Sequence, residues 1–441
     1  MPKLFGTDGI RGVANRDLTP DLLLALGRAA GVVLAERGPV VVGRDTRLSG
    51  PMLQSALVAG LCSAGAEARL AGIIPTPAVA FLTTAEKARA GAVISASHNP
   101  VADNGIKFFS DLGYKVGEDV EDAIEHALVD VPTELPEGRD IGTASPLEDG
   151  VERYLEHLLG AVDEPLSGLR VVLDCAFGAA YAVAPRAFKG AGATVSVLNA
   201  EPDGSRINVS CGSTDLAQVS REVVSTGADI GFAFDGDGDR VLAVDEEGRE
   251  VDGDRILALS ALRLKEKGEL AHNLVVGTVM SNLGFRRALA ERGIEVSTPP
   301  VGDRHVVQEM LDTGAVIGGE QSGHIVFAQH STTGDGVLTA LQVASAVAAS
   351  DQKLSSLAHV FEPFPQILIN VPVRSRDALE GADALWQQVA EAEARLGEDG
   401  RVLLRASGTE QLIRVMVEAA DGTVARQTAE SLAGAVTSHL G

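Results

Sequence analysis

The stretch PVVVGRD, at residues 39–45, is a β-branched run that ends in a polar turn, and a segment typical of a helix follows it to about residue 64. The same order returns in LRVVLDCAFGAA, at 169–180, with a helix to about Gly190, and in NLVVGTVMSN, at 273–282, with LGFRRALAERG. A short further strand comes after each: ARLAGII, TVSVLNA and IEVSTPP. Strand, helix and strand in repetition predict parallel pairing in α/β sheets.

The last part of the chain has a different order of elements. FPQILINVPV alternates like a strand, 377–395 is typical of a helix, RVLLRAS and LIRVMVEA are closely spaced strands, and 423–440 is a helix. We therefore expect an α/β protein of three tandem similar domains with mixed sheets plus a smaller C-terminal α+β domain, arranged around a central cleft. The predicted boundaries are 1–140, 141–248, 249–363 and 364–441.

Composition and charge restrict the function. The chain has 441 residues, of which 45% are hydrophobic, so it can fill several cores and is not disordered. Its net charge of -24 argues against binding to nucleic acids or anionic membranes. Three scattered cysteines offer no disulfide framework. The longest uncharged stretch, 48–66, is broken by polar residues, so we expect a cytoplasmic protein without membrane insertion.

An apolar strand followed by a tight polar turn occurs at GAVISASHNP, residues 91–100. Loops at strand ends carry ligands and nucleophiles in α/β proteins, and Ser97 stands there with His98 beside it and Lys107 shortly after. An isolated Ser-His-Asn-Pro is more typical of a plain turn that caps a short helix. A serine-hydrolase elbow is not indicated, because this serine lacks the GxSxG pattern.

Three carboxylates alternate with glycines in DGDGDR, residues 235–240, after an apolar strand. Asp235, Asp237 and Asp239 would repel one another without a cation, and hard divalent ions prefer oxygen ligands. An EF-hand loop also alternates Asp in this way, but Arg240 stands where that loop needs Gly, and a strand rather than a helix precedes it. Mg²⁺ is favoured because it binds through a few carboxylates together with phosphate or water.

Several Gly-bracketed loops carry groups suited to sugars and phosphates. GEQSGH, at 319–324, offers hydrogen-bonding partners for sugar hydroxyls or an amine, and a solvated turn is the alternative. SGTE, at 407–410, could form a nest of backbone N–H groups for an anion, and a simple hairpin turn is the alternative. Arginines also occur in three further loops, GTDGIRG, GRDTRLSG and VGDR. Together with the other loops, they suggest a cleft lined by positively charged side chains from several domains. The candidates for substrate binding are Arg11, Asp303, Arg304, Glu320, Ser322, Arg405, Ser407, Gly408, Thr409 and Arg414.

The order of these loops, one in each predicted domain, resembles the α-D-phosphohexomutase superfamily over essentially the whole chain. GTDGIRG, SASHNP, DGDGDR, GEQSGH and SGTE look most like the bacterial phosphoglucosamine mutases within it. The resemblance implies that Ser97 is a catalytic phosphoserine, and that its phosphate joins Asp235, Asp237 and Asp239 around one Mg²⁺ per subunit. The departures from the family pattern are Phe177, His305, Ala406 and Gln411.

The reaction implied by this resemblance interconverts glucosamine 6-phosphate and glucosamine 1-phosphate. The phosphoserine would phosphorylate the sugar, and glucosamine 1,6-bisphosphate, as intermediate and primer, would turn end for end and return a phosphoryl group to Ser97. Lys107 is our first candidate for the base, provided that desolvation lowers its pKa, and His98 is the second. Arg240 would stabilise phosphate charge.

The resemblance also implies partners and a metabolic place. A kinase or another phosphoryl donor would load Ser97, a homodimer is the family expectation, and the product would feed amino-sugar and cell-wall precursor synthesis. Two alternatives stay open from the sequence: the same chemistry on glucose or mannose phosphates, and a non-catalytic sugar-phosphate sensor of the same fold.

Overall fold

The computed structural model of the chain describes residues 3–6, 8–35, 37–129, 135–350, 352–407 and 411–441. The chain divides into two compact units, each with its own core. Unit 1 comprises Met1–Thr278 and Ser297–His359, and unit 2 comprises Val279–Val296 and Val360–Gly441. The candidate catalytic and metal-binding residues all belong to unit 1, whereas the SGTE segment belongs to unit 2.

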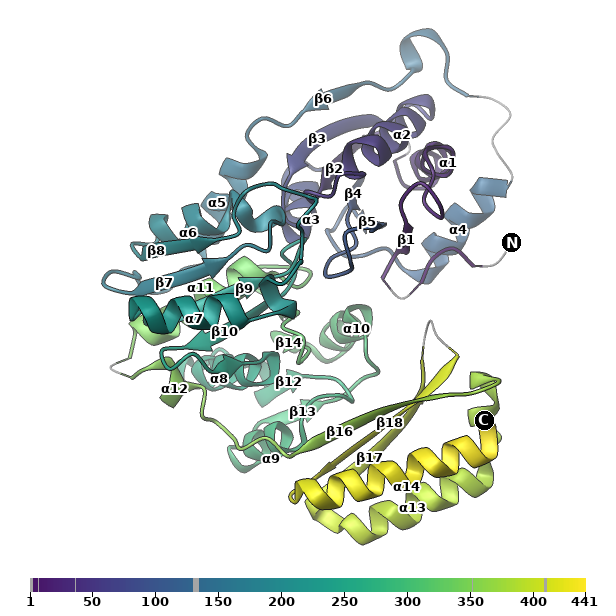
Figure 1. Cartoon of the computed structure of the whole chain (residues 1–441). Helices are drawn as coiled ribbons and strands as arrows, with labels where there is room; N and C mark the ends of the chain where they lie inside the picture. Colours follow the sequence, from purple (N-terminus) through teal and green to yellow (C-terminus); the bar gives the residue numbers. More distant parts are fainter. Residues whose placement is uncertain (1–2, 7, 36, 130–134, 351, 408–410) are drawn as a thin grey trace. The chain divides into compact units, whose positions relative to one another are not determined.

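The N-terminal part of unit 1 is built on a six-stranded sheet with the order β1-β5-β4-β2-β3-β6 (Figure 1). β2 pairs in parallel with β3 and β4, and β5 is antiparallel to β1 and β4. The strands are β1 (Ile10–Val13), β2 (Pro39–Arg44), β3 (Glu67–Ile73), β4 (Ala90–Ile94), β5 (Asp103–Ser110) and β6 (Ala144–Pro146). The helices are α1 (Pro20–Ala30), α2 (Gly50–Ser63), α3 (Thr76–Ala85), α4 (Glu118–Val129) and α5 (Gly150–Gly160). Val40, Val41 and Val42 of β2 are at most 1% exposed, which explains its unbroken apolar run.

The next part of unit 1 is a five-stranded sheet with the order β11-β10-β9-β7-β8. β7 pairs in parallel with β8 and β9, as the sequence predicts, and β9 and β10 form an antiparallel hairpin. The strands are β7 (Arg170–Asp174), β8 (Thr194–Leu198), β9 (Ile230–Phe234), β10 (Val241–Asp245) and β11 (Glu250–Val251), and the helices are α6 (Ala184–Gly190) and α7 (Ala217–Thr226). The hairpin turn carries DGDGDR.

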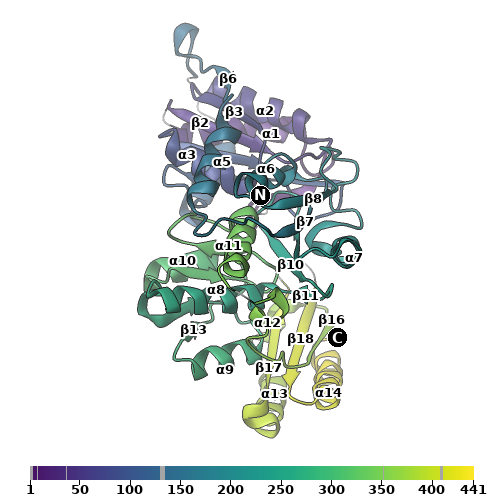
Figure 2. The ribbon, with the colours of Figure 1, turned by 90° about the vertical axis from the view of Figure 1, so that its left-hand side faces the viewer.

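The third part of the chain has short strands and longer helices. Its elements are α8 (Gly253–Lys267), β12 (Leu274–Val276), β13 (Glu295–Ser297), α10 (Asp303–Thr313), β14 (Ile317–Gly319), β15 (Ile325–Phe327), α11 (Gly336–Ala348) and α12 (Leu354–Leu357). The β-branched run within 273–282 forms β12, which ends at Val276. The polar turn that follows it leads to a helix at Leu283–Glu291, where the Asn282 side chain accepts a hydrogen bond from the Gly284 N–H. α11 packs against both β10 and α8, as Figure 2 shows from the side.

Unit 2 contains a three-stranded antiparallel sheet with the order β16-β18-β17. Its elements are α9 (Leu283–Glu291), β16 (Gln366–Pro372), α13 (Asp383–Leu396), β17 (Gly400–Ala406), β18 (Leu412–Ala419) and α14 (Gly422–Leu440). The α+β order matches the expectation. The helix predicted from residue 377 begins only at Asp383, because a 3₁₀ turn at Arg376–Leu379 and then Gly381, a poor helix former, come first.

A buried carboxylate in unit 2 joins α9 to the sheet. Glu418 of β18 is fully buried, accepts a hydrogen bond from the Leu283 N–H at 3.0 Å, and pairs with Arg401 Nε at 2.6 Å. Arg401 also donates to the carbonyl oxygens of Val279 and Ser281. This ion pair therefore holds two segments of unit 2 that are far apart in the sequence.

Replacing Arg401 with alanine is expected to lower the free energy of unfolding of unit 2 by about 3–5 kcal/mol, because the Glu418 carboxylate loses its cation while it stays buried. Denaturant titration followed by the fluorescence of Trp386, the single tryptophan, reports on this unit directly. Arg395→Ala on α13 is the control. A loss below about 1 kcal/mol would contradict the assignment of a buried ion pair.

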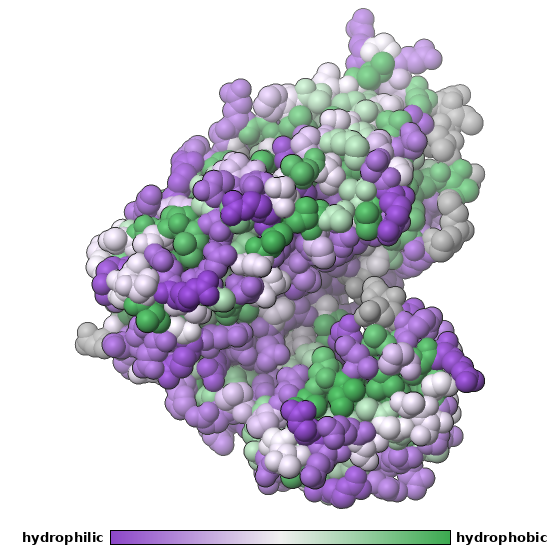
Figure 3. All heavy atoms as spheres, viewed as in Figure 1, coloured by the Kyte–Doolittle hydropathy of each residue, from purple (hydrophilic) through white to green (hydrophobic). Residues whose placement is uncertain are grey.

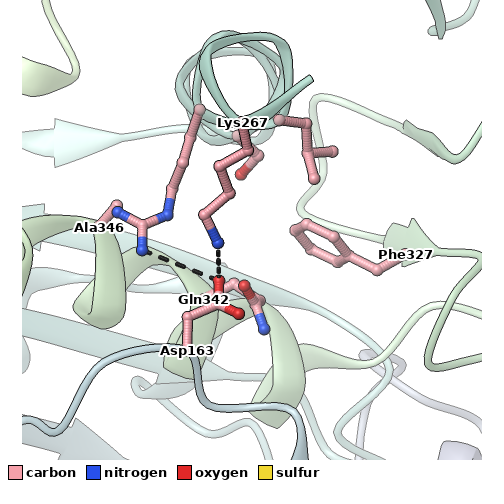
Figure 4. Close-up of a pocket in the computed structure, with 8 residues that line it drawn as sticks. Asp163, Lys267, Phe327, Gln342 and Ala346 are labelled. Carbon is pink, nitrogen blue, oxygen red and sulfur yellow. Dashed lines mark hydrogen bonds and ion pairs between the residues drawn. The ribbon is translucent and has the colours of Figure 1, made fainter. Parts of the chain in front are cut away.

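A small cavity in unit 1 is lined by Asp163, Ser260, Arg263, Leu264, Lys267, Phe327, Gln342 and Ala346 (Figure 4). Asp163, after α5, pairs with Lys267 and lies 3.8 Å from Arg263, both on α8. Gln342 of α11 donates to the Ala161 carbonyl at 2.6 Å. The cavity measures about 10 Å³, so it has no room for a sugar phosphate, and its polar groups connect helices of unit 1.

Hydrophilic side chains spread over much of the face seen in Figure 3, interspersed with smaller hydrophobic areas. Within the part of the chain that the structure describes, no helix combines the length and the apolar character that crossing a membrane requires.

Candidate active site

Ser97 lies just past the end of β4, in the turn that the sequence singles out. Its side chain is fully buried, and its hydroxyl donates to Asp235 Oδ2 at 2.5 Å. His98 Nδ1 lies 3.2 Å from the same hydroxyl oxygen. The fold thus brings together the serine loop and the tri-aspartate loop, which are 138 residues apart in the chain.

The three aspartates converge because glycines allow a tight turn between β9 and β10. Gly238 has φ +71°, a backbone conformation that favours glycine. At Gly236, a Cβ atom would lie 2.6 Å from the Ser97 carbonyl oxygen, so only glycine permits the two loops to approach this closely. The carboxylate oxygens of Asp235, Asp237 and Asp239 come within 4.8 Å of one another, and all three residues are buried.

This cluster fits a hard divalent cation. Asp237 Oδ1 and Asp239 Oδ1 are buried and have no hydrogen-bond partner among the residues that the structure describes. Burial, together with the negative charges of Asp239 and Asp237, raises the pKa of Asp235 well above its ordinary value. A bound cation would satisfy the unpartnered oxygens and offset this repulsion.

Lys107 on β5 reaches the cluster from the other side. Its Nζ lies 3.2 Å from both Asp237 Oδ2 and Asp239 Oδ2, and 3.4 Å from Asp8. Burial alone would lower the pKa of Lys107, but these three carboxylates raise it well above its ordinary value. The charges around Lys107 thus outweigh its burial, and its role as the base stays a prediction.

A chain of alternating charges leads from the cluster to the third part of unit 1. Asp8 pairs with Arg11 and with Lys115, and Lys115 pairs with Asp303 at the start of α10. Arg11 also donates to Asn99 Oδ1 in the serine loop at 2.7 Å. Arg11 and Asp303, both predicted from the sequence, thus belong to one network with the catalytic candidates.

Arg240 and His98 are the other charged candidates near Ser97. Burial alone would lower the pKa of Arg240. The negative charges of Asp239, Asp235 and Glu320 outweigh burial and raise this pKa above its ordinary value, so the guanidinium stays charged. Burial, with the positive charges of Arg240 and Arg11, lowers the pKa of His98 to about 4, and the ring is neutral at neutral pH.

The predicted sugar loop lies between β14 and β15. Glu320 accepts a hydrogen bond from the Gly302 N–H at 3.0 Å, and Ser322 Oγ lies 3.4 Å from Glu320. Arg304 points elsewhere: it pairs with Glu121 of α4, which is buried. The structure thus explains Arg304 as a link between the first and third parts of unit 1, and its contact with substrate stays a prediction.

The sequence does not predict Asp8 or Lys115 as site residues, and it includes His324 only as the last residue of the GEQSGH segment. Asp8 lies between glycines in GTDG, which is the one local signal that could have marked it. Lys115 has no such signal, and only its contacts with Asp8 and Asp303 reveal it. His324, which is 1% exposed, lies 3.7 Å from Asp303.

A cavity of about 300 Å³ borders this network. It has room for a small molecule and is more apolar than the aspartate cluster. Its lining includes Tyr114, Lys115, Val116, Asp303, Arg304 and Leu311.

The predicted phosphate loop follows β17 in unit 2. Arg405 is paired in register with Arg414 across the two strands, which places both side chains at the same end of the hairpin. Ser407 is buried, and its carbonyl accepts a hydrogen bond from Arg376 at 2.8 Å. Gly408 and Thr409 lie outside the described residues.

Comparison with known proteins gives the class. Models of phosphoglucomutase/phosphomannomutase domains I, II, III and the C-terminal domain match residues 2–132, 152–248, 252–364 and 368–435. The chain therefore belongs to the phosphoglucomutase/phosphomannomutase family, in the α-D-phosphohexomutase superfamily of phosphoryl-transferring isomerases.

Individual relatives narrow the comparison. The chain is 52% identical over 447 residues to a phosphoglucosamine mutase of Nocardioides sp., covering 100% of both chains. It is 53% identical over 426 residues to a phosphoglucosamine mutase of Moorella thermoacetica, covering 96% of each. A crystal structure of a phosphoglucomutase/phosphomannomutase family protein from Burkholderia thailandensis has a TM-score of 0.84 at 25% identity, covering 99% of this chain and 97% of that one.

Proposed function

We propose that the protein is a phosphoglucosamine mutase that interconverts glucosamine 6-phosphate and glucosamine 1-phosphate through a phosphoserine at Ser97. The observation that carries the proposal is the 2.5 Å contact between the Ser97 hydroxyl and Asp235 within the carboxylate cluster. This contact supports the proposal, because a metal-assisted phosphoryl transfer requires a nucleophile beside the metal ligands. The glucosamine specificity rests on full-length relatives of that name at about half identity.

Asp235, Asp237 and Asp239 would hold Mg²⁺, with an oxygen of the Ser97 phosphate as a further ligand. Mg²⁺ bound there would neutralise charge on the phosphoryl group during its transfer. Arg240 would share this task from the protein side. Lys107, whose Nζ lies 3.2 Å from Asp237 and Asp239, stays our first candidate for the base, and His98, whose Nδ1 lies 3.2 Å from the Ser97 hydroxyl oxygen, is the second.

Glu320 and Ser322 would bind the sugar hydroxyls or the amine. Two orientations of the sugar must use the same groups, because the bisphosphate intermediate presents first one phosphate and then the other to Ser97.

The test is an activity panel on purified protein with glucosamine, glucose and mannose phosphates, primed with a sugar 1,6-bisphosphate. We expect glucosamine phosphates to give the highest kcat/KM, and the phosphoryl group to appear on Ser97 by peptide mass spectrometry. Higher activity on mannose or glucose phosphates would assign the same chemistry to another sugar. A protein that binds sugar phosphates without turnover would be a sensor instead.

The proposed function also implies a phosphoryl donor, an oligomeric state and a cellular location. A kinase or a bisphosphorylated sugar would load Ser97 for the first cycle. A homodimer, measurable by light scattering, is expected from family membership. Phosphorylated sugars do not cross membranes unaided, so the cytoplasm is the expected location.

Replacing Arg405 with alanine is expected to raise KM and to lower kcat/KM by about 10–10³-fold, because one charge-assisted contact of roughly 1.5–4 kcal/mol to the non-reacting phosphate is lost. Remote phosphate binding also positions the reacting end of the sugar, so kcat falls as well. Steady-state kinetics below KM measures the effect, with Arg426→Ala on α14 as the control. Unchanged kinetics in Arg405→Ala would contradict a phosphate-binding role.

A further inference from the structure

Ser97 has an unusual backbone for a serine. Its φ is +52°, a region that residues other than glycine rarely adopt, and such conformations persist only where neighbours hold them. Its side chain is fully buried and points at Asp235. The direction of the hydroxyl therefore depends on whatever fixes this peptide.

Two side chains from different parts of unit 1 hold the carbonyl side of Ser97. Arg47, in the loop after β2, donates from Nη2 to the Ser97 carbonyl at 3.0 Å and to the Asn99 carbonyl at 2.8 Å. Asn208, in the loop that precedes α7, donates from Nδ2 to the same two oxygens at 2.8 and 3.3 Å. The serine loop is thus held from two sides.

Arg47 is saturated with acceptors. It is fully buried, and its Nε donates to Asp45 Oδ2 at 2.9 Å. Its Nη1 donates to the carbonyl oxygens of Pro100 at 2.5 Å and Asp103 at 2.9 Å. With the two bonds from Nη2, all five guanidinium N–H groups are used, an arrangement that a lysine ammonium cannot reproduce.

The amide side of Ser97 depends on the same ion pair. The Ser97 N–H donates to Ser95 Oγ at 2.9 Å, and Ser95 Oγ donates to Asp45 Oδ2 at 2.6 Å. Asp45 is itself fully buried. Both polar groups of the Ser97 backbone are therefore connected to the Asp45–Arg47 pair.

We propose that Arg47 and Asn208 are positioning residues that hold Ser97 in its left-handed conformation, so that its oxygen faces the aspartate cluster. The proposal rests on the proposed function, in which Ser97 carries the phosphoryl group. Neither side chain is bonded to the metal-binding aspartates, and both act through the Ser97 peptide. Their loss should slow phosphoryl transfer more than it weakens binding of the sugar phosphate.

The experiment uses Arg47→Lys and Asn208→Asp in the full chain. Lysine keeps the positive charge beside Asp45 but cannot reach all the carbonyl oxygens. Aspartate matches asparagine in shape and tolerates positive φ, but it cannot donate to the Ser97 carbonyl. Arg69→Lys is the control, since Arg69 on β3 pairs with Glu67 and Glu86, away from the serine loop.

Each protein is phosphorylated with glucose 1,6-bisphosphate, the phosphate on Ser97 is counted by mass spectrometry, and single-turnover transfer to glucosamine 6-phosphate is measured. The rate constant counts only molecules that carry phosphate, so partial misfolding does not alter it. We expect it to fall about 10–100-fold in each variant, with KM within about threefold of wild type, because small misplacements of reacting atoms are costly. The phosphorus-31 resonance of the phosphoserine should shift in both variants and not in Arg69→Lys.

Transfer within twofold of the wild-type rate in both variants would overturn this proposal while leaving the proposed function intact. Absence of transferable phosphate on Ser97 in the wild-type enzyme would overturn the proposed function, and this inference with it. If Arg47→Lys does not fold, the Asn208→Asp rate decides alone.

Discussion

Replacing Ser97 with alanine is expected to reduce mutase turnover by more than 10²–10³-fold, beyond the effect of losing one electrostatic contact. The Ser97 hydroxyl oxygen would carry the phosphoryl group between the two sugar positions. Among the residues that the structure describes, the one other hydroxyl that is hydrogen-bonded to the aspartate cluster is that of Thr76. Coupled assays of glucosamine 1-phosphate formation measure the loss. Retention of more than about a hundredth of the wild-type rate would exclude a covalent role.

The left-handed backbone at this position supplies a matched control. Ser97→Gly removes the same hydroxyl but adopts φ +52° without strain, so it should be at least as stable as Ser97→Ala and equally inactive. Thermal unfolding of both variants separates a loss of chemistry from a loss of fold. A Ser97→Gly protein that regains activity would show that Ser97 is only a structural turn.

Changing Asp237 to asparagine is expected to weaken Mg²⁺ binding and to lower turnover by about 10²–10³-fold. Asp237 is buried, accepts a hydrogen bond from the Thr76 hydroxyl at 2.6 Å, and leaves its Oδ1 without a partner in the described part of the chain. The asparagine keeps the shape but removes one of the charges that attract the cation. Isothermal titration with Mg²⁺ and initial rates measure the two effects separately.

Two controls test the metal site: a variant of an exposed carboxylate in the same part of the chain, and removal of the metal from the wild-type enzyme. Glu247→Gln changes an exposed carboxylate in the turn that follows β10 and should alter neither quantity. Treatment of the wild type with EDTA should abolish activity, and added Mg²⁺ should restore it. Zn²⁺ is not expected to bind at this cluster, since its preferred Cys and His ligands are absent from the triad. Full activity after chelation would contradict the metal assignment.

Local patterns in the sequence were sufficient to predict the order of elements. The run PVVVGRD forms β2, the alternating FPQILINVPV forms β16, and the segment after residue 423 forms a long helix. One boundary differs from the prediction. The helix expected from residue 377 begins at Asp383, because a 3₁₀ turn and then Gly381, a poor helix former, come first.

What the sequence determined by itself is the chemistry of each loop: a serine after an apolar strand, three aspartates between glycines, and arginines around small residues. The residues that make up each loop lie within a few positions of one another, so the sequence shows their spacing directly. The tertiary structure alone decided which groups meet. It set Lys107 among three carboxylates and so raised its pKa, paired Arg304 with Glu121, and turned Arg47 inward to the serine loop. Electrostatic and hydrogen-bond energies depend on distances through space, and these partners come from segments that the sequence separates by as many as 183 residues.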